Sequence, residues 1–179
     1  MQFPESNFWN FSINFYQISD IEKSCLALQD NYQLNVNLIL FCHWLALNKQ
    51  QALSQSQWQI LVAAAQPWED IIQTLRKSRR MITNSSIAWP TDFKQETSNG
   101  VSSIEINTEH MQQLSIEQAW KAFDITECED SPLEILQHNI KNYLIASDSQ
   151  FTIEQLQKEL DTIEQASIDF QLNNQTMAL

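Results

Sequence analysis

The residues best suited to chemistry in this chain are four basic side chains on one short segment. They lie within five consecutive positions, at Arg76, Lys77, Arg79 and Arg80, and make up four of the ten basic residues. Guanidinium groups bind carboxylates and phosphates through paired, charge-assisted hydrogen bonds. On a helix, Arg76 and Arg80 are four positions apart and share one flank. The segment therefore predicts a positive edge that can meet an anionic partner.

A second group of polar residues surrounds the most apolar segment of the chain. Asp30, Asn35 and Asn37 lie near its beginning, and His43 lies inside it. Burying such groups without a hydrogen-bond partner costs about 1–3 kcal/mol each, so each of them needs a partner. The 3.6-residue period places Arg79 on the apolar face of its helix, where we predict that it pairs with Asp30.

These groups have two interpretations. In the structural one, which we favour, Asp30 and Arg79 form a buried ion pair, and the basic edge docks the acidic C-terminal half, which is tethered at high effective concentration. In the functional one, Arg76 and Arg79 bind an anionic ligand in a pocket beside Trp44 and Trp68. The candidate ligand-binding residues are Asp30, Asn37, His43, Trp68, Arg76, Arg79 and Arg80.

Other kinds of site are not predicted. A single glycine leaves no glycine-rich loop for a nucleotide. Cys42 and His43 are adjacent and point to different sides of a helix, while Glu134 and His138 form an isolated pair, so neither predicts a metal site. We therefore expect no catalytic residue, no metal and no cofactor. His110 and His138 are expected to be surface histidines.

The element that must position these groups is the segment at residues 35–47. Its sequence, NVNLILFCHWLAL, is almost entirely apolar and uncharged, so a helix formed from it must be buried on all sides. It is well short of the roughly 20 residues that span a membrane. One glycine and four prolines disfavour tight β-turns. The expected fold is all-α, a compact bundle of about six to eight helices around a buried central helix.

The remaining pattern divides the chain into three regions. Residues 1–83 are predicted to be an apolar helical core, in which Pro67 begins a new helix. Residues 84–108, rich in Ser, Thr and Asn, are predicted to be a linker or long loop. Residues 109–179 are predicted to be an acidic helical region that packs on the core and is not clearly a separate domain.

Two helices of the acidic region are expected to form a hairpin. Ser131 and Glu134 make a capping box with a proline between them, which predicts a helix start. A second helix is expected to begin near Thr152 and to carry an apolar stripe as far as Phe170. The previous helix repeats this spacing, so the two stripes are predicted to face each other in an antiparallel pair.

The charge of the chain is distributed unevenly. The first 82 residues hold six acidic and six basic side chains, so the net charge of −12 lies in the rest. The negative electrostatic field of so acidic a chain repels phosphate groups, so nucleic acid and anionic lipid are disfavoured as partners. The N-terminus has no basic start and no apolar run of the kind that begins a secretory signal. We expect a cytoplasmic protein whose partner is another protein or a second copy of itself, with no membrane association.

Four segments in the first 82 residues resemble a family of small proteobacterial proteins known as a domain of unknown function. They are FWNFSINFY at residues 8–16, CLALQD at 25–30, NVNLILFCHWLA at 35–46, and Trp68 followed by LRKSRR at 75–80. The resemblance fades after Thr83. It implies a compact α-helical bacterial domain and supplies no catalytic residue.

Two functions follow as hypotheses. The first is a non-enzymatic interaction or regulatory module, in which the acidic hairpin at residues 131–170 engages another protein. The second is a small-molecule-binding protein or enzyme that acts on an anionic ligand at the cluster of Arg, Asp and Trp residues. A concave pocket at that cluster would favour the second.

Overall fold

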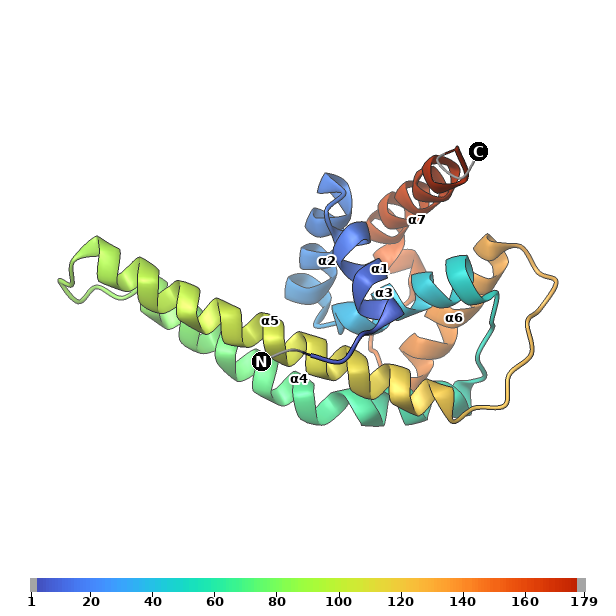
Figure 1. The fold of residues 1–179 in the computed structure, drawn as a ribbon, viewed down its shortest axis with the longest axis horizontal. Helices are drawn as coiled ribbons and strands as arrows, with labels where there is room; N and C mark the ends of the chain where they lie inside the picture. The colour runs from blue at the N-terminus through green and yellow to red at the C-terminus, as the bar shows by residue number, and fades with distance from the viewer. Residues whose placement is uncertain (1–2, 177–179) are drawn as a thin grey trace.

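The described part of the chain is made of helices alone (Figure 1). The computed structural model describes residues 3–176, except for the side chains of Ser19 and of residues 168–176. Within that part there are seven α-helices, one π-helical segment and no strand, which confirms the all-α prediction. The elements are α1 (Asn7–Tyr16), α2 (Ser19–Tyr32), α3 (Val36–Trp44), η1 (Leu45–Lys49), α4 (Gln55–Thr83), α5 (Thr91–Lys121), α6 (Pro132–Ala146) and α7 (Ile153–Thr176).

Helix α3 is the buried centre of the body, as its composition predicts. Asn35 caps it, because its side chain accepts a hydrogen bond from the Leu38 amide at 3.1 Å. Every residue from Asn37 to Trp44 is buried. The helix continues into η1, which ends where Gln50 adopts a left-handed backbone conformation with a φ of 48°.

Helices α4 and α5 lie side by side and extend as a long arm beyond the body (Figure 1). A capping box between Ser54 and Gln57 begins α4. Pro67 lies inside this helix, so the predicted break there is wrong. A proline in a helix loses one backbone hydrogen bond. The helix nevertheless continues, because α5 packs along its length and stabilises it.

The long loop predicted at residues 84–108 is also wrong. The connection covers residues 84–90, and α5 begins at Thr91. The first half of α5 is rich in residues with low helix propensity, among them Gly100. Gly100 has no other atoms close to the position that a side chain would take, so packing does not require a glycine there. This segment is helical because it packs against α4. A hydrogen bond of 3.2 Å between the hydroxyl groups of Thr83 on α4 and Ser98 on α5 adds to this contact. Packing on a neighbouring helix outweighs weak intrinsic propensity.

The last two helices belong to the body and do not form the predicted hairpin. The capping box of Ser131 and Glu134 begins α6 as expected. However, α6 packs mainly on α4, and α7 packs mainly on α2. The apolar stripes of both helices are buried, but against a core that they share with the N-terminal helices. Phe170, the last position of the predicted stripe, lies outside the described side chains.

One core joins the N-terminal and C-terminal parts of the chain. Phe41 and Trp44 of α3 contact the indole of Trp120 on α5, with ring centroids 6.3 and 5.0 Å apart. The hydroxyl of Tyr143 on α6 accepts a hydrogen bond from the Asn35 amide at 3.0 Å. Ile163 of α7 is fully buried in the same cluster. None of the described helices has both the length and the apolar character needed to cross a membrane.

Candidate functional site

A cleft of about 580 Å³ lies where the arm meets the body, between α1, α2 and α3 on one side and α4 and α5 on the other. One wall is apolar and aromatic and includes Trp9, Ile13, Tyr16 and Leu26. The opposite side is polar and charged. The volume is within the range of about 300–1,000 Å³ that is typical of small-molecule sites. The concave pocket that the ligand-binding hypothesis requires is therefore present.

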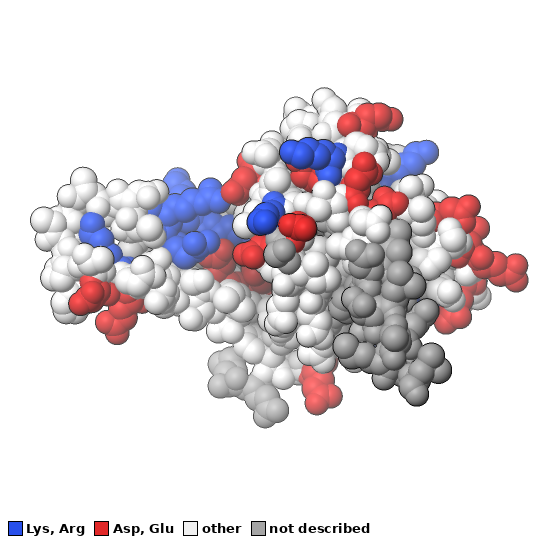
Figure 2. Space-filling view, turned by 90° about the horizontal axis from the view of Figure 1, so that it is seen from above, with Lys and Arg blue, Asp and Glu red and all other residues white. Residues whose placement is uncertain are grey.

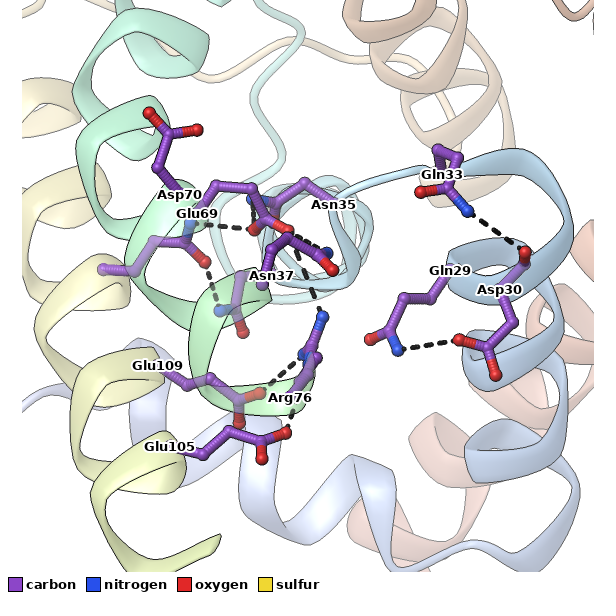
Figure 3. A network of polar contacts seen from close by, with 12 residues as sticks. Gln29, Asp30, Gln33, Asn35, Asn37, Glu69, Asp70, Arg76, Glu105 and Glu109 are labelled. Carbon is purple, nitrogen blue, oxygen red and sulfur yellow. Dashed lines mark hydrogen bonds and ion pairs between the residues drawn. The ribbon is translucent and has the colours of Figure 1, made fainter. Parts of the chain in front are cut away.

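Arg76 is at the centre of the charged side (Figure 3). Its Nη2 donates to Glu109 at 2.7 Å and its Nε donates to Glu105 at 3.1 Å. Glu69 lies 4.0 Å from its Nη1. Only 12% of the Arg76 side chain is exposed, so the ion pairs are shielded from water. The guanidinium is thus held by three carboxylates that come from α4 and α5.

The other two arginines are also held within the chain. Arg79 donates from Nε to Glu105 at 2.8 Å, and Arg80 donates to Asp30 at 2.9 Å. The predicted pair of Arg79 with Asp30 is therefore wrong, because Asp30 faces the next arginine along the helix. Arg76 and Arg79 therefore meet carboxylates of the acidic part of the chain, as the intramolecular interpretation predicts, whereas Arg80 meets Asp30 of the neutral N-terminal half.

A chain of side-chain amides links α3 to both helices of the arm. Gln113 donates to Asn37 at 2.7 Å, and Asn37 donates to Gln112. Gln112 donates in turn to the Ala65 carbonyl at 3.0 Å and to Glu69 at 3.2 Å. Asn37 and Gln112 each accept and donate, so the chain has a direction: it begins at the Gln113 amide nitrogen and ends at the Ala65 carbonyl and Glu69.

Two buried polar atoms on the cleft lining have no hydrogen-bond partner among the described residues. They are the Gln113 Oε1 and the hydroxyl of Ser12. Buried polar atoms are nearly always paired, and one left unpaired costs about 1–3 kcal/mol. Both residues line the cleft, and the two atoms themselves lie buried beneath its surface. A rotation of the Gln113 amide or the Ser12 hydroxyl would bring an acceptor or a hydroxyl group to a molecule in the cleft.

The electrostatics of the cleft are negative. Four carboxylates line it against three guanidinium groups, a formal net charge of −1. The pKa of Glu109 is raised above its ordinary value, mainly by burial. Arg76 acts to lower this pKa, whereas the negative charges of Glu105 and Glu69 act to raise it further. For Asp30, burial acts to raise the pKa, but hydrogen bonds from Gln29 and Arg80 lower it overall. Burial also raises the pKa of Tyr16, which keeps its hydroxyl protonated.

The structure brings five of the seven predicted site residues together. Asn37, Arg76, Arg79 and Arg80 line the cleft, and Asp30 contacts Arg80 at its edge. Figure 3 shows Asp30 on α2, to the right of Arg76 and the carboxylates that surround it.

The other two predicted residues, His43 and Trp68, lie outside the cleft. His43 is fully buried between α3 and α7, with its Nδ1 2.9 Å from the Ser167 hydroxyl. Trp68 donates to the Ser115 hydroxyl at 2.8 Å and joins α4 to α5. Both side chains contribute to packing between helices, since the His43 ring also contacts the Phe15 ring on α1, with centroids 5.3 Å apart.

Sequence reasoning missed the acidic half of the site. Glu105, Glu109 and Gln113 recur every fourth residue, which places them on one face of α5. That spacing was a usable signal, but residues 84–108 were assigned to a loop, where periodicity has no meaning. His110 was also misassigned. It is buried and stacks on Trp9 with centroids 4.2 Å apart, whereas His138 is exposed as predicted.

No group of three or more metal-binding side chains among the described residues is arranged to hold a metal ion. The three glutamates that surround Arg76 are neutralised in part by that arginine. The cleft therefore presents carboxylates, amides and a hydroxyl as groups that can bind an organic ligand directly.

Comparison with known proteins identifies a family and no function. Neither the curated proteins nor the solved structures include a match to this chain. One family model matches residues 7–116, and its description is "protein of unknown function (DUF2390)". The match begins with α1 and ends within α5, so it contains every residue of the cleft described above. Because the match covers more than half of its length, the chain belongs to this family of proteins of unknown function.

Proposed function

We propose that the chain binds a small amphipathic molecule with a cationic amine at one end, in the cleft between α1, α2, α3 and the arm. The single observation that carries this proposal is the pair of unpaired buried atoms, the Gln113 Oε1 and the Ser12 hydroxyl. A carbonyl oxygen can only accept a hydrogen bond, so a ligand that pairs with the Gln113 Oε1 brings an N–H or O–H donor.

The charge of the lining favours an amine over an acid. All three nitrogens of the Arg76 guanidinium face carboxylates, so an anion could reach it only by displacing a glutamate. A cation instead compensates the formal charge of −1 on the lining. Trp9 and Tyr16 add aromatic faces, which attract cations. The anionic ligand expected from the arginines alone is the competing proposal.

The apolar wall indicates the rest of the ligand. Ile13 and Leu26 are 41% and 42% exposed although they line a concave surface. A hydrocarbon or aromatic body that covers them gains about 25 cal/mol for each Å² removed from water. A ligand with an apolar body and an amine head therefore matches both sides of the cleft.

Three probes of nearly equal size and different charge test the proposal. Phenethylamine is cationic, 2-phenylethanol is neutral, and 3-phenylpropionate is anionic. Binding is measured by tryptophan fluorescence, because Trp9 lines the cleft, and by ligand-observed NMR. We expect phenethylamine to bind most tightly and 3-phenylpropionate to bind least. Tighter binding of the acid would reverse the proposal in favour of an anionic ligand.

A matched pair of variants locates the binding. Ile13→Trp fills the cleft, whereas Ile60→Trp makes the same change on α4 at a position outside the cleft lining. The two isoleucines have similar exposed fractions, 41% and 51%. Phenethylamine binding should be lost in the first variant and retained in the second. Equal binding by both would show that the probe binds elsewhere.

A further inference from the structure

The end of the arm carries an exposed apolar patch that the cleft does not use. We define the tip patch as Met81, Ile87, Trp89 and Phe93, which are 66%, 62%, 61% and 59% exposed. All four line one concave surface of about 490 Å³ formed by the end of α4, the connection and the start of α5. Figure 1 shows this end of the arm far from the body, so none of the body helices covers it.

The tip patch is displayed on an ordered backbone. Lys94 donates to the Ser85 carbonyl at 2.6 Å, and the Ile87 amide donates to the Ser85 hydroxyl at 3.2 Å. The Trp89 amide donates to the Ile87 carbonyl at 2.8 Å. These bonds fix the connection between α4 and α5 and hold the aromatic side chains in the open. A surface ordered in advance loses less conformational entropy on binding.

The apolar area that the tip patch exposes is large enough for a contact between two copies of the chain. A large apolar side chain presents about 200 Å² when fully accessible, so the exposed fractions of these four residues sum to roughly 500 Å² per chain. The largest exposed apolar patch on a typical monomer covers about 300–600 Å² and is often functional. Two such patches in contact bury about 1,000 Å², which is the lower bound for a specific interface between proteins.

The charges around the tip patch suit a second copy of the same surface. Lys77 and Lys94 lie beside it, and the first two turns of α5, which carry Phe93, also carry the acidic residues Asp92 and Glu96. Figure 2 shows both blue and red groups near this end of the arm, in contrast to the acidic far end of the molecule. In a twofold contact a residue on the axis meets its own copy and a residue away from the axis meets a different one, so a surface that carries both signs around its rim can complement itself.

We propose that two copies of this chain associate through the tip patches of their arms, with Trp89 and Phe93 at the centre of the interface. Aromatic residues at the centre of a desolvated patch supply most of the binding energy of such contacts. This dimer leaves the cleft at the base of the arm open. It is therefore independent of the proposed ligand.

Sedimentation velocity on the full chain, from about 1 to 100 µM, tests this inference at concentrations where weak dimers form. We expect a mass that rises toward twice the 20.9 kDa of one chain. Trp89→Asp and Phe93→Asp should each return the protein to a monomer, because the interface would then bury an unpaired charge. Ile60→Asp, at an exposed position elsewhere on α4, should remain dimeric.

Two results would overturn the proposal. If the wild-type chain stays monomeric over the whole concentration range, the tip patch is not a dimer contact, and its partner would be a different protein. A dimer that survives both aspartate variants would place the interface elsewhere. As a second measurement, Ile87→Cys in a Cys128→Ser background should cross-link as a dimer on oxidation, because Cys25 and Cys42 are buried and do not compete.

Discussion

Acid should destabilise this protein through a single buried histidine. His43 is fully buried, and burial lowers its pKa from the ordinary value of 6.5 to about 3. Its Nδ1 is within hydrogen-bond distance of the Ser167 hydroxyl, and its Nε2 has no partner among the described residues. The folded state therefore keeps this ring neutral at pH values where the unfolded chain protonates it.

The direction and size of the effect follow from proton binding. Below pH 6.5 the unfolded state takes up a proton at His43, and the folded state does not until about pH 3. Because the unfolded state then binds more protons, the free energy of unfolding falls as the pH falls through this window. The loss is about 1.4 kcal/mol per pH unit. The full slope applies only once the unfolded histidine is mostly protonated, so acidification from pH 6.5 to about 4.5 should remove about 2–3 kcal/mol. This is a large share of a typical folding free energy of about 5–15 kcal/mol.

Urea unfolding followed by tryptophan fluorescence, repeated from about pH 7 to 4.5, measures this loss. The comparison is with His43→Asn, which cannot titrate but keeps a polar group near the Ser167 hydroxyl. This variant should be less stable than wild type near neutral pH and should lose about 2–3 kcal/mol less on acidification. Contributions from Glu109, Asp30 and other groups are present in both proteins and cancel in the difference.

Ile39→Val is the control for destabilisation alone. Ile39 is fully buried on the same helix, and the substitution removes one methylene at a cost of about 0.5–1.5 kcal/mol without changing any titrating group. Its pH dependence should run parallel to that of wild type. If His43→Asn also runs parallel to wild type, the assignment of the acid effect to His43 is refuted.

The remaining predictions concern the arm and its junction with the body. Arg76→Met leaves three carboxylates without their shared cation and should lower the free energy of unfolding by about 3–5 kcal/mol, measured by urea unfolding. Arg80→Met breaks an exposed pair and should lower it by under about 1 kcal/mol. Equal losses in the two variants would contradict the different burial of the two ion pairs. Asn139 is fully buried and bonds to the Trp58 indole and to the backbone before α4, so Asn139→Leu should lower stability by about 1–3 kcal/mol for each group left unpaired, measured by thermal unfolding. Pro67→Ala restores a backbone donor inside α4 and should raise stability by about 1–3 kcal/mol in the same assay; a loss would mean that packing of the proline ring outweighs the missing bond.

Local signals in the sequence predicted the parts of the fold that depend on neighbouring residues. The uncharged run at residues 35–47 identified the buried helix, because no side of it can face water. The capping boxes at Ser54 and Ser131 located two helix starts, since a cap involves residues three positions apart. The clustering of basic residues at positions 76–80 is also a local signal, and it identified the arginines of the candidate site. It could not identify the hydrogen-bond partners of Arg79 and Arg80, which lie 26 and 50 residues away in the sequence.

The sequence by itself determined that this is an all-helical chain with one helix buried on every side and a cluster of arginines near it. Only the tertiary structure decided that residues 91–108 are helical, because their propensity is weak and α4 provides the surface that stabilises them. It also decided which carboxylate each arginine meets. A shift of one position along α4 turns a side chain by about 100°, so Arg79 faces Glu105 while Arg80 faces Asp30. Such a choice depends on how two distant helices are aligned, and no local pattern encodes that alignment.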